Sequence, residues 1–179
     1  MLKQIWYSVL LSFQFFTILP VHKELPLTKT TVTGMFAFLP WIGAIIGSFI
    51  AASVYGLTQW TSSSEMLLAF VVIALFALFT GGLHLDGFID MGDAYFSYRD
   101  REKRLEILDD PRVGAFGVLS VLSLVLGKFV ILHELFVQEK LELWTLLFIP
   151  LLTRVGMIFY FTSLRCSKEK GLAYFLEVK

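Results

Sequence analysis

Three aspartates lie at helical spacing in the segment GGLHLDGFIDMGDAYF, directly after a long apolar run. Asp86, Asp90 and Asp93 are spaced i, i+4 and i+7, so a helix carries all three carboxylates on one face. Like charges at this spacing repel one another unless a cation sits among them. Mg²⁺ takes oxygen ligands, typically one or two carboxylates together with substrate phosphates. The pattern therefore predicts a Mg²⁺ site, with Mn²⁺ as the alternative ion.

A solvated helix face is the ordinary explanation for a run of acids. This run has no basic residue three or four positions away, and it begins in a near-apolar stretch, where ionisable groups are usually functional. The spacing does not fit an EF-hand loop, and a zinc site through His84 and Asp86 lacks a second His or Cys nearby. His84 is a candidate general base, because free imidazole has a pKa of about 6.5. Its alternative role is to orient Asp86.

Basic residues follow the acids in the segment RDREKRLEILDDPRVGAFG. A diphosphate held between Mg²⁺ and arginines is a common arrangement in phosphoryl transfer. We therefore expect Arg104 and Arg112 to bind substrate phosphate, and Gly114 and Gly117 to present backbone N–H groups to it near a helix N-terminus. The alternative is a cytoplasmic amphipathic helix whose basic charge follows the positive-inside rule.

Two further charges, Lys128 and Arg154, lie in the middle of apolar segments. Snorkelling explains charges near the ends of membrane helices but not at their middle. Each is expected either to pair with an acid, such as Glu134, or to line a polar cavity and contact substrate. The sequence leaves both alternatives open.

The composition is that of an all-α, polytopic integral membrane protein. Of the 179 residues 56% are hydrophobic, and 18 are Phe. Four segments come near the roughly 20 apolar residues that a membrane helix needs. These predicted spans are residues 34–57, 65–80, 113–137 and 141–164. Residues 5–19 form a shorter apolar segment, predicted as an interfacial or re-entrant helix with a short span as the alternative.

The charges predict the orientation of this bundle of four to five membrane helices. Most Lys and Arg residues lie in loops 20–33 and 81–112 and in tail 165–179, whereas Lys140 is the basic residue on the opposite side. The positive-inside rule places the basic side in the cytoplasm. We expect one domain over residues 1–179, with residues 81–112 as its cytoplasmic-side catalytic segment.

Several classes of protein are excluded by simple counts. Lys+Arg and Asp+Glu are both 15, so the charge balance indicates no nucleic-acid partner. The single cysteine, Cys166, excludes an internal disulfide and a cysteine metal cage. No cleavage site follows the apolar start of the chain, so a secretory signal peptide is not expected.

The acidic and basic motifs together resemble the cobalamin-5′-phosphate synthase family (adenosylcobinamide-GDP ribazoletransferase). The resemblance rests on TGGLHLDGFIDMGDAYF followed by RLEILDDPRVGAFGV. FFTILPV, FLPWIGAIIG and KEKGLAYF are also similar to that family, so the likeness covers essentially the whole chain. Family members run longer, so the resemblance implies a chain that is C-terminally truncated. A helix face left without its neighbours would suit a homo-oligomer or a partner.

The resemblance implies a Mg²⁺-dependent transferase of bacterial or archaeal cytoplasmic membranes. Its substrates would be adenosylcobinamide-GDP and α-ribazole or α-ribazole 5′-phosphate, and GMP would leave. The implied metal ligands are Asp86, Asp90 and Asp93, with Arg104, Arg112 and Lys128 neutralising the leaving GMP. The proton of the attacking hydroxyl would pass to His84 or to one of the three aspartates.

Three other functions compete with this interpretation. A CDP-alcohol phosphotransferase has D-G-x-x-A-R followed by G-x-x-x-D-x-x-x-D, but DGFIDMGD lacks the Ala-Arg and the second half is absent. A transporter would use the acids and the two mid-segment cations as an ion path, but the sequence has no internal repeat. A purely structural role as a membrane subunit would not explain the three aspartates.

Overall fold

The computed structural model describes residues 2–163, and in this range the chain is helical, without strands. Helices α2 (Lys29–Trp60), α6 (Ala115–Val137) and α7 (Leu143–Ser163) are each long and apolar enough to cross a membrane. Helices α3 (Glu65–Phe79) and α4 (Leu83–Phe96) form a fourth span if that bent pair counts as one. The predicted all-α membrane fold is confirmed. The predicted basic tail, Cys166 and the KEKGLAYF segment lie outside the described residues.

The contacts divide the chain into two compact units. The first contains α1, α2 and α7, and the second contains α3 to α6. Every candidate site residue except Arg154 lies in the second unit. The single domain predicted over residues 1–179 stays a prediction.

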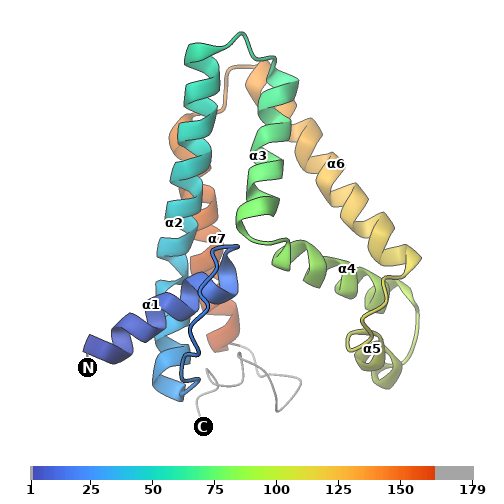
Figure 1. The fold of residues 1–179 in the computed structure, drawn as a ribbon. Helices are drawn as coiled ribbons and strands as arrows, with labels where there is room; N and C mark the ends of the chain where they lie inside the picture. Colours follow the sequence, from blue (N-terminus) through green and yellow to red (C-terminus); the bar gives the residue numbers. More distant parts are fainter. Residues whose placement is uncertain (1, 164–179) are drawn as a thin grey trace. The chain divides into compact units, whose positions relative to one another are not determined.

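In the first unit, α2 (Lys29–Trp60) and α7 (Leu143–Ser163) lie side by side (Figure 1). Gly43 and Gly47, spaced i, i+4 on α2, let the backbones approach closely. A Cβ at either glycine would lie less than 3 Å from a backbone carbonyl oxygen of α7. Small residues at this spacing are a common means of packing membrane helices.

The short helix α1 (Leu2–Phe16) packs across α2 rather than along it (Figure 1). The hydroxyl of Ser12 donates a 2.9 Å hydrogen bond to the carbonyl oxygen of Met35, and Leu11 is buried in the contact. With 15 residues, α1 is too short to cross a bilayer unaided. Its direction relative to α2 favours the interfacial alternative that the sequence left open.

In the second unit, α3 (Glu65–Phe79) packs on α6 (Ala115–Val137). The chain then turns by 90° into α4 (Leu83–Phe96), and the short helix α5 (Arg101–Ile107) follows. The sequence predicted a helix through the acidic motif, and α4 is that helix. Part of the charged segment that follows is also helical, at α5. The turn ends the predicted span 65–80 at its C-terminal side.

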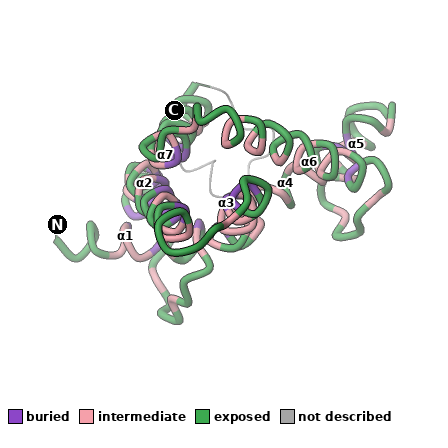
Figure 2. Tube along the Cα trace, turned by 90° about the horizontal axis from the view of Figure 1, so that it is seen from above, coloured by how far each residue is buried: buried purple, intermediate pink, exposed green. Residues whose placement is uncertain are grey.

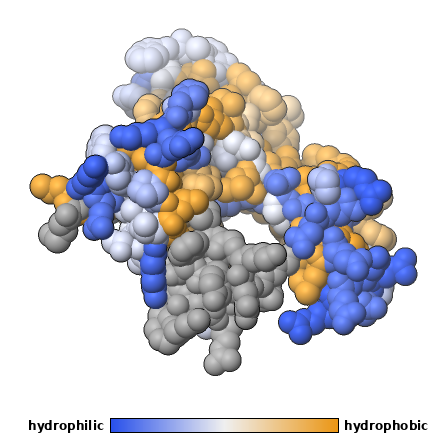
Figure 3. All heavy atoms as spheres, turned by 60° about the horizontal axis from the view of Figure 1, so that its bottom comes forward, coloured by the Kyte–Doolittle hydropathy of each residue, from blue (hydrophilic) through white to orange (hydrophobic). Residues whose placement is uncertain are grey.

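Side-chain exposure separates the apolar and charged ends of this unit. Figure 2 shows α6 exposed along most of its length, and Gly117 is its one buried residue. An apolar helix of this kind suits contact with lipid. Hydrophilic residues gather instead over α5 and its flanking loops (Figure 3). The charged segment is thus distinct from the apolar part of the unit.

Candidate functional site

Two glycines make the turn that separates the acidic helix from α3. Gly81 and Gly82 have φ of 61° and 72°, in the left-handed region that favours glycine. Their N–H groups donate to the carbonyl oxygens of Leu78 and Ala77, which closes the end of α3. The carbonyl oxygen of Gly82 then accepts from the N–H of Asp86 at 2.9 Å, in the first turn of α4. The acids therefore lie on a helix that is separate from α3.

The three aspartates of α4 interact with one another as their spacing predicted. Burial raises the pKa of Asp90 above its ordinary value, and the negative charges of Asp86 and Asp93 raise it further. Asp86 is exposed, whereas Asp90 and Asp93 are half-buried. A cation bound at Asp86 and Asp90 would relieve this repulsion.

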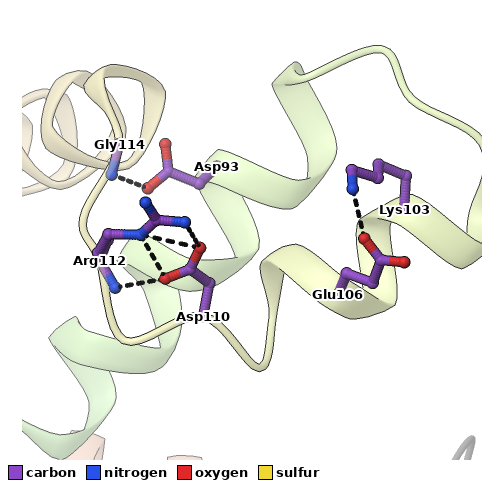
Figure 4. A network of polar contacts seen from close by, with 6 residues as sticks. All are labelled: Asp93, Lys103, Glu106, Asp110, Arg112 and Gly114. Carbon is purple, nitrogen blue, oxygen red and sulfur yellow. Dashed lines mark hydrogen bonds and ion pairs between the residues drawn. The ribbon is translucent and has the colours of Figure 1, made fainter.

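Asp93 binds another helix. Its Oδ2 accepts from the N–H of Gly114 at 2.7 Å (Figure 4). Its Oδ1 accepts from the N–H of Gly117 at 2.8 Å. Gly114 is the N-cap of α6 and has no side chain with which to cap it. The carboxylate of α4 therefore caps the first turn of α6. The N–H groups predicted to bind substrate phosphate are already hydrogen-bonded to this carboxylate.

The arrangement bears on the predicted metal site. Among residues 2–163, no group of three or more His, Cys, Asp or Glu side chains lies close enough to hold one ion. Asp86 and Asp90, one helical turn apart, are a carboxylate pair of the kind that Mg²⁺ uses together with substrate phosphates. The donor chemistry therefore fits Mg²⁺ through two aspartates of this chain.

His84 lies in the first turn of α4, two residues before Asp86. Residues two positions apart on a helix do not face each other. His84 therefore lies off the face that carries the three carboxylates, although the sequence predicted that it could orient Asp86. Its predicted role as a base stays a prediction.

Arg112 is held by Asp110, which was not among the site residues predicted from the sequence. Nε of Arg112 donates to Oδ1 of Asp110 at 2.9 Å, and Nη2 donates to Oδ2 at 2.6 Å (Figure 4). Hydrogen bonds from the side chain and backbone of Arg112 lower the pKa of Asp110 to about 2. The pair could have been predicted from the sequence, because Asp110 and Arg112 are only two positions apart in the segment DDPRVG. Bidentate pairing of this kind fixes the plane of a guanidinium.

Arg104 packs on α4. Its guanidinium carbon lies 6.0 Å from the ring centre of Tyr95, a cation–π distance, and the side chain is half-buried. Nearby on α5, Lys103 forms an ion pair with Glu106, three residues later (Figure 4). Arg104 and Arg112 thus belong to the same unit as the aspartates.

The two mid-segment cations have different surroundings. Lys128 is exposed on α6 and takes part in none of the ion pairs found among residues 2–163. Glu134 lies beside His133, so it does not provide the pairing with Lys128 that the sequence left open. Arg154 is buried in α7 of the other unit, where its Nη1 is 3.3 Å from the hydroxyl of Thr153. Substrate contact by either cation stays a prediction.

Comparisons with known proteins agree with the motifs. Residues 8–178 match the family model described as cobalamin-5-phosphate synthase. A Geobacillus sp. (strain WCH70) protein named adenosylcobinamide-GDP ribazoletransferase is 36% identical over 172 residues, which are 96% of this chain and 65% of that relative. Proteins of the same name from Halalkalibacterium halodurans and Clostridium botulinum (strain 657 / Type Ba4) are 34% and 33% identical. These alignments cover 93% and 95% of this chain, and 63% and 67% of the two relatives.

No solved structure matches this chain significantly. The chain spans about 65% of the length of the Geobacillus relative, and the family model covers nearly all of the chain. The chain belongs to the cobalamin-5-phosphate synthase family.

Proposed function

We propose that this chain takes part in an adenosylcobinamide-GDP ribazoletransferase reaction in a cytoplasmic membrane. Adenosylcobinamide phosphate would pass from adenosylcobinamide-GDP to α-ribazole or its 5′-phosphate, with release of GMP. The observation that carries the proposal is the carboxylate pair Asp86 and Asp90 on α4, in the same unit as Arg104 and Arg112. Membership in the family and the names of the relatives supply the substrates.

The carboxylate pair would hold Mg²⁺, or Mn²⁺ in its place. When bound, such an ion neutralises charge on the diphosphate and orients it. Because α4 leaves α3 at an angle of 90°, its carboxylates would lie at the membrane surface, where a water-soluble nucleotide would have access. By the positive-inside rule this would be the cytoplasmic face.

The reaction is a displacement at phosphorus. The hydroxyl oxygen of the ribazole forms a bond to the phosphorus that carries the cobinamide, and the bond from that phosphorus to the oxygen of GMP breaks. Arg112 and Arg104 would neutralise the departing phosphate. The hydroxyl proton would pass to His84 or to a carboxylate of α4. Most of the rate enhancement would come from positioning and charge neutralisation.

A transferase assay tests the proposal. Membranes that contain the chain are supplied with adenosylcobinamide-GDP and α-ribazole, with Mg²⁺ or with EDTA, and GMP release and cobalamin formation are followed. We expect product with Mg²⁺ and none with EDTA. CDP-alcohol substrates in the same membranes should give no product, which separates this activity from the competing phosphotransferase.

The matched variants are Asp90→Asn, which removes a proposed metal ligand, and Glu102→Gln, which neutralises an exposed acid of α5. Asp90→Asn should abolish product while the chain still inserts, and Glu102→Gln should retain it. Absence of product from the unaltered chain, beside an active Geobacillus relative in the same membranes, would contradict the proposal. Undiminished turnover by Asp90→Asn at the Mg²⁺ concentration used for the unaltered chain would contradict the metal assignment.

A further inference from the structure

The contact between α4 and α6 is built around one carboxylate. Both oxygens of Asp93 accept backbone hydrogen bonds, from Gly114 at 2.7 Å and from Gly117 at 2.8 Å. These partners lie 21 and 24 positions later in the chain. A carboxylate at a helix N-terminus also interacts favourably with the helix dipole. The charge of Asp93 is therefore already balanced, in part, by protein groups.

Glycines leave the space that this contact needs. A Cβ at Gly114 or Gly117 would lie less than 3 Å from an oxygen of Asp93, and a Cβ at Gly92 would lie less than 3 Å from the hydroxyl of Ser120 on α6. In contrast, a Cβ at Gly87 of α4 or at Gly127 of α6 would meet no atom within 4 Å. The close approach is thus confined to the positions around the carboxylate.

The contact also determines where Arg112 lies. Arg112 is two residues before Gly114, on the loop that joins α5 to α6, and its guanidinium is held by Asp110 on the same loop. Asp93 fixes the end of that loop on α4, the helix that carries Asp86 and Asp90. A shift of α6 away from α4 would therefore change the position of the arginine relative to the carboxylate pair.

We propose that Asp93 is a positioning residue, whose carboxylate ties α4 to the first turn of α6 and so sets Arg112 relative to Asp86 and Asp90. It is not the third metal ligand that its spacing in the sequence indicates. The contact between α4 and α6 is inferred from the two hydrogen bonds of Asp93. Its effect on substrate binding rests on the proposed transferase function.

The contact between α4 and α6 is tested first by a measurement that does not depend on enzymatic activity. In a Cys166→Ser background, Phe96→Cys and Phe116→Cys place thiols at two exposed aromatic side chains whose ring centres are 6.4 Å apart on α4 and α6. The rate of disulfide formation is then compared with and without Asp93→Asn. The amide replaces one of the two acceptor oxygens with an NH2 donor and removes the negative charge. Cross-linking should therefore slow roughly tenfold, as expected for the loss of a hydrogen bond to a charged group.

Glycine variants keep the test independent of the folding of Asp93→Asn. Gly117→Ala and Gly114→Ala keep the carboxylate but crowd it, and each should slow cross-linking in the same way. Gly127→Ala, in the same helix with open space around it, should leave the rate unchanged. The double variant Asp93→Asn, Gly117→Ala should cross-link only slightly more slowly than either single variant, because both substitutions act on the same contact.

Metal binding separates a positioning residue from a ligand. Mn²⁺ alone is titrated into the protein and followed by electron paramagnetic resonance. We expect the Mn²⁺ midpoint of Asp93→Asn to stay within about twofold of the unaltered protein, while Asp86→Asn and Asp90→Asn raise it at least about tenfold. A raised midpoint in Asp93→Asn with normal cross-linking would overturn the proposal in favour of a ligand.

Substrate kinetics test the consequence for Arg112. Asp93→Asn and Gly117→Ala should raise the half-saturating concentration of adenosylcobinamide-GDP by about tenfold, and Asp93→Asn should add little in an Arg112→Ala background. Slower cross-linking with an unchanged half-saturating concentration would overturn the positioning role and leave a structural tie. If the unaltered chain makes no product, the transferase proposal fails, whereas the cross-linking and Mn²⁺ results still decide between tie and ligand.

Discussion

Asp110 holds the guanidinium of Arg112 through two of its nitrogens, Nε at 2.9 Å and Nη2 at 2.6 Å. The backbone N–H of Arg112 also donates to Asp110, at 3.0 Å. The arginine side chain is 87% exposed, so the face turned away from Asp110 is accessible to an anion. A guanidinium held in this way is oriented before a phosphate arrives, which lowers the entropic cost of binding.

Asp110→Asn should weaken substrate binding without removing turnover. The amide keeps one acceptor for Arg112 but loses the charge that holds the guanidinium in place. We expect the half-saturating concentration of adenosylcobinamide-GDP to rise by a few-fold, and kcat to fall less. Steady-state kinetics in membranes measure both, with Asp109→Asn, at the neighbouring acid, as the control. A larger loss than that of Arg112→Ala would show that Asp110 does more than orient this side chain.

The ion pair between Asp110 and Arg112 should stay intact across the physiological pH range. The pKa of Asp110 is lowered to about 2 in the folded chain, below the unfolded value near 3.9. Its contribution to stability is therefore complete above about pH 4 and is lost as the pH falls through about 2. Between pH 5 and 8, the substrate affinity that depends on Arg112 should not change because of Asp110. An NMR titration of Asp110 with an apparent pKa above 4 would contradict this.

Asp86→Asn and Asp90→Asn should each remove Mg²⁺-dependent turnover. Each substitution leaves a single carboxylate at a site where two carboxylates would bind Mg²⁺ together with the substrate phosphates. We expect activity to fall by at least about 100-fold, as when an electrostatic contribution is removed from a transition state. Membrane insertion, followed by protease accessibility of the α4–α5 segment, should be unchanged. Raising the Mg²⁺ concentration should recover part of the activity if the residues bind metal.

His84→Gln should reduce turnover less than Asp86→Asn. The helical turn of α4 places His84 off the carboxylate face, because residues two apart do not face each other. A side chain that acts as general base contributes typically about 100-fold or more. A loss of that size, with the alkaline shift of the pH–rate profile expected on removal of an imidazole base, would restore His84 as the base. We expect a change below about tenfold.

Gly43→Ala and Gly47→Ala should destabilise the first unit. A Cβ at either position would lie less than 3 Å from α7 backbone atoms, and backbone cannot move aside as a flexible side chain can. Overpacking of this kind costs about 1–3 kcal/mol. Thermal unfolding in detergent measures the loss. Gly156→Ala on α7, where a Cβ would meet nothing within 4 Å, is the matched control and should leave the unfolding temperature nearly unchanged.

Much of the fold follows from local sequence. The apolar runs predicted the spanning helices, because a helix of about 20 apolar residues has no better environment than a bilayer. The i, i+4, i+7 spacing likewise predicted that the three aspartates share one face of a helix, and the raised pKa of Asp90 agrees with that. Both are properties of neighbouring residues, which the chain imposes wherever the helix lies.

The partners of these residues were decided by tertiary structure alone. Nothing in the spacing of Asp93 indicates that its carboxylate binds the N–H groups of Gly114 and Gly117, because that contact needs α4 and α6 to pack together. The 90° turn at Gly81 and Gly82 depends on left-handed backbone angles, which glycine permits but does not require. The sequence by itself determined which groups can do chemistry, and packing between distant segments decided which of them are already occupied by the protein.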